Sequence, residues 1–172
     1  EFGKVICIST GFFMNTNEDS FRVRSFHAPD EREVLSSFVL FLQSIETPGP
    51  WYFCGHNIRE FDIPYLCRRL LANRIPIPGC LDFQSKKPWE TNLIDTFQYW
   101  RFGDYKNYTS LNLLAKVLDV PSPKNEIDGS KVGSLYWEAD PLQQQENMKK
   151  IIEYCECDVA ASANIFLKLL VR

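Results

Sequence analysis

Residues 51–70 read WYFCGHNIREFDIPYLCRRL, and this stretch decides the fold. Residues 51–54 form an aromatic run that ends at Gly55, a pattern typical of a buried strand followed by a sharp turn. Pro64 is compatible only with the first turn of a helix, so the helix that follows begins close to Asp62. The stretch therefore predicts a strand, a polar turn and a helix, with Asp62 where the helix starts.

Asp62 has two interpretations at this position. In open α/β sheets, ligands bind at the carboxyl ends of strands and beside helix N-termini, which is where this carboxylate is expected to lie. Aspartate is also a preferred N-cap, because its side chain accepts a hydrogen bond from the first turn of a helix. The residue alone is compatible with a functional role or with capping.

Composition restricts the class of protein. The 172 residues are 45% hydrophobic and 14% aromatic, which excludes a disordered chain and suffices for a single domain with a substantial core. The net charge of -3 disfavours binding of nucleic acid by global charge, so a polyanion would be held by a local patch or by metal ions. No run approaches the ~20 apolar residues that span a bilayer, and no secretory signal opens the chain. The 6 cysteines lie mostly in apolar patterns, as reduced thiols do, so we expect a cytoplasmic protein without a membrane partner.

The remaining apolar patterns predict strands and helices in alternation. Strands are expected over residues 4–13, 21–26 and 93–97, and the first two are expected to form a hairpin. Helices are expected to begin at Asp30, at Thr109 or Ser110, and at about Pro141. This order predicts an α/β fold with a mixed sheet flanked by helices.

Two loops between these elements stand out. Residues 73–92 are long for a connection, and such loops are usually functional or mobile. Residues 101–108 interleave basic and aromatic side chains, and Lys86 and Lys87 add two further cations. These residues either contact a nucleic-acid strand or are solvated loop charges.

The last helix, over residues 141–170, carries a second candidate acid. Tyr154 and Asp158 are spaced i, i+4, so they lie on the same side of the helix with Cβ atoms ~5–6 Å apart. The expected core stripe consists of Ile151, Cys155, Val159, Ser162, Phe166 and Leu169. Asp158 falls at the edge of this stripe, whereas Glu153 and Glu156 are expected to face solvent. Asp158 is either part of a site or half of a structural ion pair, and Tyr154 alone is compatible with simple packing.

Two such acids suit a hard divalent cation. Mg²⁺ prefers carboxylate oxygens, and two ions can stabilise the attacking and leaving oxygens of a phosphodiester. Asp62, Asp158 and Tyr154 are a partial set for such a site.

Two motifs resemble those of a known family. His56-Asn57-x-x-x-Phe61-Asp62 resembles the second motif of the DEDD superfamily of 3′-5′ exonucleases, and Tyr154-x-x-x-Asp158 resembles their third motif in its tyrosine-bearing form. Their order and context are similar to those of predicted bacterial exonucleases related to the proofreading domain of family B DNA polymerases. Ser110-Leu111-x-x-Leu114-Ala115 and residues 124–132 are similar to that subfamily too.

The resemblance implies a ribonuclease H-like fold and hydrolysis of the terminal phosphodiester of single-stranded DNA with two Mg²⁺ or Mn²⁺ ions. Asp158 would be a direct metal ligand, and Asp62 would bind the second metal directly or through water. Tyr154 would orient the attacking water. Asn57 and Phe61 would contact or stack against the terminal nucleotides. RNA is the alternative substrate, and the resemblance leaves the oligomeric state open.

The sequence departs from the family at its first motif. That motif is Asp-x-Glu on the first, central strand, and it is not found among these 172 residues. We expect residues 1–172 to be one exonuclease-like domain that is incomplete at its N-terminus, inactive alone, and completed by upstream residues or by a strand from another chain. A noncatalytic nucleic-acid or protein binding module on the same scaffold is the alternative. Whether Asp95 and Asp128 have functional roles is left open.

Overall fold

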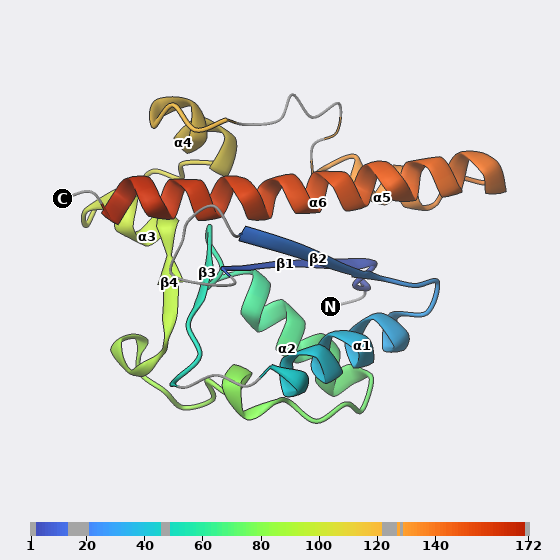
Figure 1. The fold of residues 1–172 in the computed structure, drawn as a ribbon, viewed down its shortest axis with the longest axis horizontal. Helices are drawn as coiled ribbons and strands as arrows, with labels where there is room; N and C mark the ends of the chain where they lie inside the picture. The colour runs from blue at the N-terminus through green and yellow to red at the C-terminus, as the bar shows by residue number, and fades with distance from the viewer. Residues whose placement is uncertain (1–2, 14–20, 46–48, 122–126, 128, 171–172) are drawn as a thin grey trace.

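The computed structural model describes residues 3–13, 21–45, 49–121, 127 and 129–170, which form an α/β fold with two small sheets (Figure 1). The predicted α/β class is therefore confirmed. No helix in these residues is long and apolar enough to cross a membrane.

The first sheet is the predicted hairpin. Strands β1 (Cys7–Phe13) and β2 (Phe21–His27) are antiparallel, in a register that places Cys7 opposite His27 and Phe13 opposite Phe21. Helix α6 (Pro141–Leu170) lies along this hairpin (Figure 1). Gly11 permits the close approach, because an added Cβ would lie 2.8 Å from Cγ1 of Val159 on the helix.

The second sheet contains the stretch that opens the candidate site. Strands β3 (Phe53–Gly55) and β4 (Leu93–Asp95) are parallel, with Gly55 opposite Asp95. Helix α2 (Asp62–Ala72) follows β3, and two 3₁₀ turns, Gly79–Leu81 and Pro88–Glu90, lie between α2 and β4. The predicted strand, turn and helix are confirmed in their order, but the strand covers residues 53–55 instead of 51–54 and is not buried, since Cys54 is exposed.

The remaining helices cover the two sheets. They are α1 (Glu31–Ser44), α3 (Thr96–Arg101), α4 (Leu111–Val117) and α5 (Val132–Tyr136). Helix α6 contacts β1, β2 and β3 on one side, and α1 packs on the hairpin from the other side (Figure 1). Asp30 and Ser110 cap α1 and α4 as predicted, because each side chain accepts a backbone N–H from the first turn.

A buried carboxylate joins the helices on the α1 side. Glu31 accepts hydrogen bonds from the Val5 backbone N–H at 2.6 Å, from the Arg69 guanidinium and from the Asn73 amide at 2.9 Å. Its pKa falls to about 2, because these donors outweigh the effect of burial, which raises the pKa. Glu31 thus connects the start of α1, the end of α2 and the segment before β1.

Three expectations need correction. The four strands form one antiparallel pair and one parallel pair, and no strand hydrogen bonds join the two pairs in the described residues, so these strands do not make one continuous sheet. The strand predicted over residues 93–97 ends at Asp95, and residues 96 and 97 begin α3. On α6, Ile151, Ala161 and Ile165 are buried, whereas most of the predicted stripe beyond Ile151 is only half-buried.

Candidate active site

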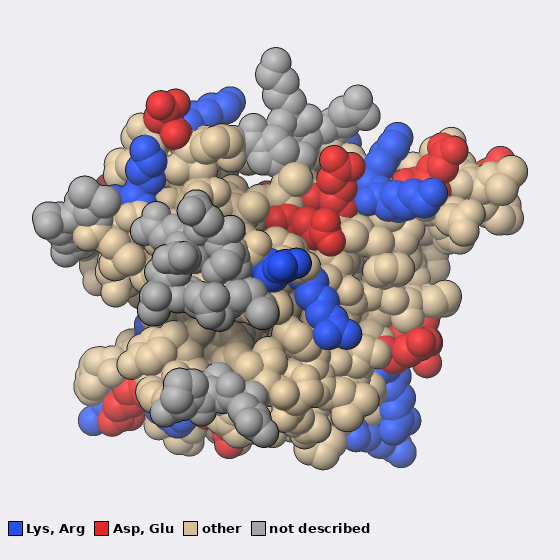
Figure 2. Space-filling model, in the orientation of Figure 1, with Lys and Arg blue, Asp and Glu red and all other residues tan. Residues whose placement is uncertain are grey.

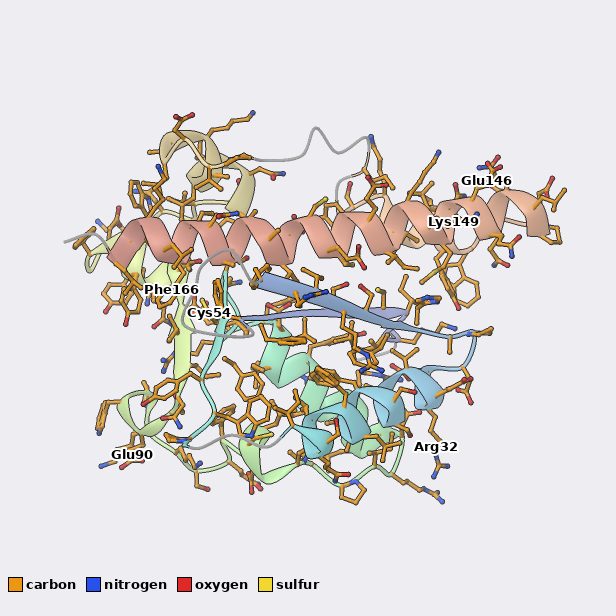
Figure 3. The ribbon with its side chains drawn as sticks, in the orientation of Figure 1. Arg32, Cys54, Glu90, Glu146, Lys149 and Phe166 are labelled. Carbon is orange, nitrogen blue, oxygen red and sulfur yellow. The ribbon has the colours of Figure 1, made fainter. Side chains whose placement is uncertain are left out.

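The candidate site consists of acids at the start of α2 and in the middle of α6. Helix α6 contacts β3, and Figure 3 labels Cys54 on this strand and Phe166 on the part of the helix near it. The charge of Asp158 on α6 raises the pKa of Asp62 on α2, so the two carboxylates lie within electrostatic reach of each other. The fold therefore brings together two acids that the sequence places far apart.

Asp62 is the first residue of α2 and does not cap it. The N-cap is Phe61, and no side-chain hydrogen bond closes this helix end. The Asp62 side chain reaches the surface, yet neighbouring protein atoms remove part of its hydration. The pKa of Asp62 rises to about 6, mainly because of this loss of hydration. A hydrogen bond from its own backbone N–H opposes the rise, and the charges of Asp95 and Asp158 add to it. The capping interpretation is therefore wrong, and the carboxylate is held where its charge is disfavoured.

Tyr154 and Asp158 interact directly. The Tyr154 hydroxyl donates a hydrogen bond to the Asp158 carboxylate, in agreement with their predicted position on the same side of the helix. Partial burial raises the pKa of Asp158, and this hydrogen bond opposes the rise. Gly129 lies close by, since an added Cβ there would be 3.7 Å from the Tyr154 hydroxyl. Asp128 lies outside the described residues.

Asn57 shapes the turn that leads to Asp62. Its φ of 61° is left-handed, a conformation that asparagine adopts more readily than most residues. Its carbonyl accepts hydrogen bonds from the backbone N–H groups of Glu60 at 3.3 Å and Phe61 at 3.0 Å. Its side-chain Oδ1 is buried and has no hydrogen-bond partner within the described part of the chain. The turn therefore places a buried acceptor five residues before Asp62.

Asp95 holds this turn in place. The side chain is 1% exposed, and it accepts backbone N–H groups of Asn57 at 2.9 Å, Arg59 at 3.2 Å and Phe97 at 3.0 Å. It therefore caps α3 and fixes the turn between β3 and α2 at the same time. Sequence reasoning placed Asp95 in a strand and left its role open. An aspartate that closes a short apolar strand just before a helix is a signal for such a cap.

His56 ties the same turn to the start of α4. Its Nε2 donates to the Thr109 carbonyl at 2.8 Å, and its Nδ1 lies 3.0 Å from the Thr96 hydroxyl. Burial lowers the pKa of His56, so the neutral imidazole, with Nδ1 as acceptor, is favoured. His56 is thus a structural member of its motif.

Phe61 presents its ring to solvent beside Asp62. The residue is 61% exposed, and its ring is parallel to that of Tyr65, with centroids 6.0 Å apart. The predicted site residues thus fall into two groups. Asp62, Tyr154 and Asp158 form the acidic centre, and Asn57 and Phe61 lie in the turn before Asp62.

The acidic residues fit part of a metal shell. Asp62 and Asp158 supply hard oxygen ligands, and a cation between them would relieve their mutual repulsion. No group of three or more His, Cys, Asp and Glu side chains among the described residues is arranged to hold a metal ion. The described side chains therefore account for two ligands, and the remaining ligands of Mg²⁺ or Mn²⁺ would be water, substrate or further acids.

The surroundings of Asp158 test two expectations, that Glu156 faces solvent and that Asp158 forms a structural ion pair. Glu156 accepts a hydrogen bond from the Ser25 hydroxyl at 2.7 Å, so it faces the hairpin and not solvent. Glu153 is exposed, as expected. Between described residues, no ion pair of Asp158 with Lys or Arg is found. The structural ion pair considered for Asp158 is therefore not supported.

Comparison with known proteins gives one match. Residues 1–171 match a family model described as "Predicted 3'-5' exonuclease related to the exonuclease domain of PolB". No protein of curated function and no solved structure matches the chain. The matched region contains every residue of the candidate site.

Proposed function

Because the chain belongs to the family of predicted 3′-5′ exonucleases related to the exonuclease domain of PolB, we propose that it hydrolyses the terminal phosphodiester of single-stranded DNA with the help of divalent ions. The observation that carries the proposal is that Asp62 lies within electrostatic reach of Asp158, to which Tyr154 is hydrogen-bonded. The same arrangement would serve RNA, the alternative substrate.

The two carboxylates are the proposed metal ligands. Asp158 would bind one Mg²⁺ or Mn²⁺ ion directly, and Asp62 would bind a second ion directly or through water. Their raised pKa values support this role, because loss of hydration disfavours both negative charges, the charge of Asp158 disfavours that of Asp62 further, and a cation would compensate them. Bound ions would supply charge stabilisation for the attacking and leaving oxygens.

Tyr154 is the proposed positioning residue for the attacking water. Its hydroxyl hydrogen is donated to Asp158, which leaves the oxygen lone pairs as acceptors. A water that donates to this oxygen would be oriented beside the Asp158 carboxylate. Asp158 fixes the direction of the tyrosine hydroxyl and thereby the position of the water.

Asn57 and Phe61 are the proposed contacts to the terminal nucleotides. The buried Oδ1 of Asn57 is an acceptor without a partner in the described residues, so a sugar hydroxyl at the 3′ end would satisfy it. The exposed ring of Phe61 offers a surface on which a terminal base can stack. Both residues precede Asp62 in one turn, so they would hold the end of the strand near the acidic centre.

The complete domain is proposed to have a ribonuclease H-like sheet. A strand between β1 and β3 would join the antiparallel and parallel pairs, and an Asp-x-Glu on that strand would supply the remaining acids. The 172 residues contain no Asp-x-Glu, so the search belongs in the whole open reading frame that encodes them. Finding the motif there favours the enzyme.

The test is a nuclease assay on the protein expressed from that whole open reading frame. In Asp158→Ala, loss of a metal ligand should abolish Mg²⁺- or Mn²⁺-dependent release of 3′ mononucleotides from a labelled oligonucleotide. Circular dichroism should show an unchanged fold. Glu153→Ala is the matched control, because Glu153 is an exposed acid on the same helix, and it should keep full activity. Turnover of Asp158→Ala within about tenfold of wild type would assign Asp158 a structural role only.

A second variant in the same assay separates orientation from packing. Tyr154→Phe keeps the ring and removes the hydroxyl, so kcat should fall ~10²-fold with little change in KM. An unchanged kcat, or a loss confined to KM, would assign Tyr154 to packing or binding.

A noncatalytic binding module remains the second candidate. It is favoured by the lack of Asp-x-Glu in the sequence and of a three-ligand cluster among the described side chains. This candidate predicts that even the protein from the whole open reading frame binds a single strand and never shortens it. Robust digestion of an oligonucleotide by the 172-residue chain alone would mean that further acids of this chain complete the metal site. Asp128 would then be the first to mutate, because both oxygens of Asp95 already accept backbone hydrogen bonds.

A further inference from the structure

The loop between α3 and α4 exposes three aromatic rings next to the candidate site. Phe102 is 78% exposed, Tyr105 is 77% exposed and Tyr108 is 64% exposed. Single exposed apolar residues are common on proteins, but several large exposed rings on one short loop indicate a binding surface. We call these three residues the aromatic loop.

Arg101 holds the central ring of the aromatic loop. Its guanidinium carbon lies 4.2 Å from the centroid of the Tyr105 ring and 5.4 Å from that of Phe97. Its Nη1 lies 3.9 Å from Oε1 of Glu60, in the turn before Asp62. One face of Tyr105 is therefore covered by a cation, and most of the ring is open to solvent.

Asp104 fixes the backbone that carries the rings. Its carboxylate accepts the backbone N–H of Lys106 and the side-chain amide of Asn107, both at 3.0 Å, and its own N–H donates to the Arg101 carbonyl at 2.7 Å. The rings therefore lie on an ordered turn, so little conformational entropy is lost when a partner binds.

The aromatic loop is attached to the turn that leads to Asp62. The ring of Tyr108 lies 6.4 Å from that of His56 and 5.1 Å from that of Phe97, centroid to centroid. The Thr109 carbonyl accepts the hydrogen bond from His56. Since His56 directly precedes Asn57, a strand with its 3′ end at Asn57 and Phe61 would find these rings beside it.

The charges near the loop favour stacking over ionic binding. Arg101 and Lys106 are opposed by Asp104, so the loop carries little net charge. On the face shown in Figure 2, Lys and Arg are interspersed with Asp and Glu. An aromatic surface beside one or two cations is the chemistry that binds the bases of a single strand without reading its sequence.

We propose that Phe102, Tyr105 and Tyr108 form a stacking platform for the bases of a single strand, on the 5′ side of the nucleotides held by Asn57 and Phe61. This inference rests on the proposed function. It adds the surface that binds the part of the substrate that lies outside the acidic centre. The partner is single-stranded nucleic acid, because the bases of a duplex are already stacked on one another.

The test measures the affinity of the 172-residue chain for oligonucleotides in EDTA, by fluorescence anisotropy of a labelled thymidine strand of about 12 nucleotides. Tyr105→Ala should weaken binding about tenfold, because one stacked base is lost, and Tyr105→Phe should bind like the wild type. The dissociation constant of a thymidine dinucleotide, obtained by competition with the strand, should be the same for wild type and Tyr105→Ala, because the dinucleotide reaches only Asn57 and Phe61.

Trp89→Ala is the matched control. Trp89 is 77% exposed, and the Lys87 ammonium lies 5.4 Å from its ring, so its exposure and its cation resemble those of Tyr105. It lies before β4, whereas the aromatic loop follows the other end of this strand. Its neighbour Glu90 is labelled at that distant end in Figure 3. Trp89→Ala should bind the strand like the wild type.

Each outcome bears on a different claim. Binding by Tyr105→Ala and Phe102→Ala within about twofold of wild type overturns the platform and leaves the proposed function standing. An equal loss in Trp89→Ala also overturns the platform, since any exposed ring would then suffice. If the wild-type chain binds no oligonucleotide at low salt, the proposed substrate is wrong and the platform falls with it.

Discussion

Gly11 shows how one missing side chain positions an acid on another element. An added Cβ would lie 2.8 Å from Cγ1 of Val159 and 2.1 Å from Cζ of Phe21, so hairpin and helix meet without room for a methyl group. Val159 directly follows Asp158. The contact at Gly11 therefore sets how closely Asp158 approaches the sheet.

Gly11→Ala should lower the free energy of unfolding by about 1–3 kcal/mol, because the added methyl group forces Phe21 and α6 to move. Urea denaturation measures the change. The matched control is Gly133→Ala on α5, where an added Cβ meets nothing within 4 Å, and there alanine should not destabilise. An equal effect at both positions would show that crowding at Gly11 is not the cause.

Asp95 acts at the scale of elements, because one carboxylate joins β4, α3 and the turn after β3. Asp95→Ala should lower the free energy of unfolding by about 2–4 kcal/mol, since three backbone N–H groups lose a charged acceptor in a buried place. Thermal and urea denaturation would measure this loss. Asp82→Ala is the control, because Asp82 is exposed and accepts one backbone N–H, from Gln84. A loss for Asp95→Ala no larger than for Asp82→Ala would mean that the carboxylate does not hold the turn.

The elements that the sequence predicts well have a long apolar period or a proline that marks where a helix starts. Helix α6 spans Pro141–Leu170 as expected, because its period persists over eight turns, and Pro64 locates the start of α2. Helix α3 was missed, because residues 96–101 are rich in aromatic and β-branched side chains that favour strands. Its helix depends on the Asp95 cap, which no periodicity reveals.

The same limit applies to the candidate site. Spacing within one helix predicts that Tyr154 and Asp158 lie on the same side, and the hydrogen bond between them agrees with this prediction. Contacts between distant segments are set by tertiary packing. Local pattern therefore could not predict the hydrogen bond between Ser25 and Glu156. Nor could it predict the hydrogen bond from the Asn57 backbone N–H to Asp95.

At the scale of the whole molecule, Glu31 makes stability depend on acid pH. Its pKa is about 2 in the fold, against 4.5 for a free glutamate, so its contribution is complete above about pH 4.5 and is lost as the pH falls toward 2. Glu31→Gln should therefore lower the free energy of unfolding by up to about 3 kcal/mol at neutral pH, and the difference from wild type should vanish near pH 2.

Urea denaturation across this pH range measures the effect of Glu31→Gln. The exposed Glu33 on the same helix provides the control, and Glu33→Gln should leave the pH profile unchanged. A difference between wild type and Glu31→Gln that stays constant with pH would rule out the ionised carboxylate as its source.

The division of the strands into two pairs has a consequence for handling the protein. Every described strand has a neighbour on one side only, so each is an edge strand of its sheet. Edge strands offer unpaired N–H and C=O groups that can recruit strands from other molecules. The 172-residue chain should accordingly self-associate as its concentration rises. An added strand that pairs with both sheets should reduce this association, whether or not it also supplies residues for catalysis.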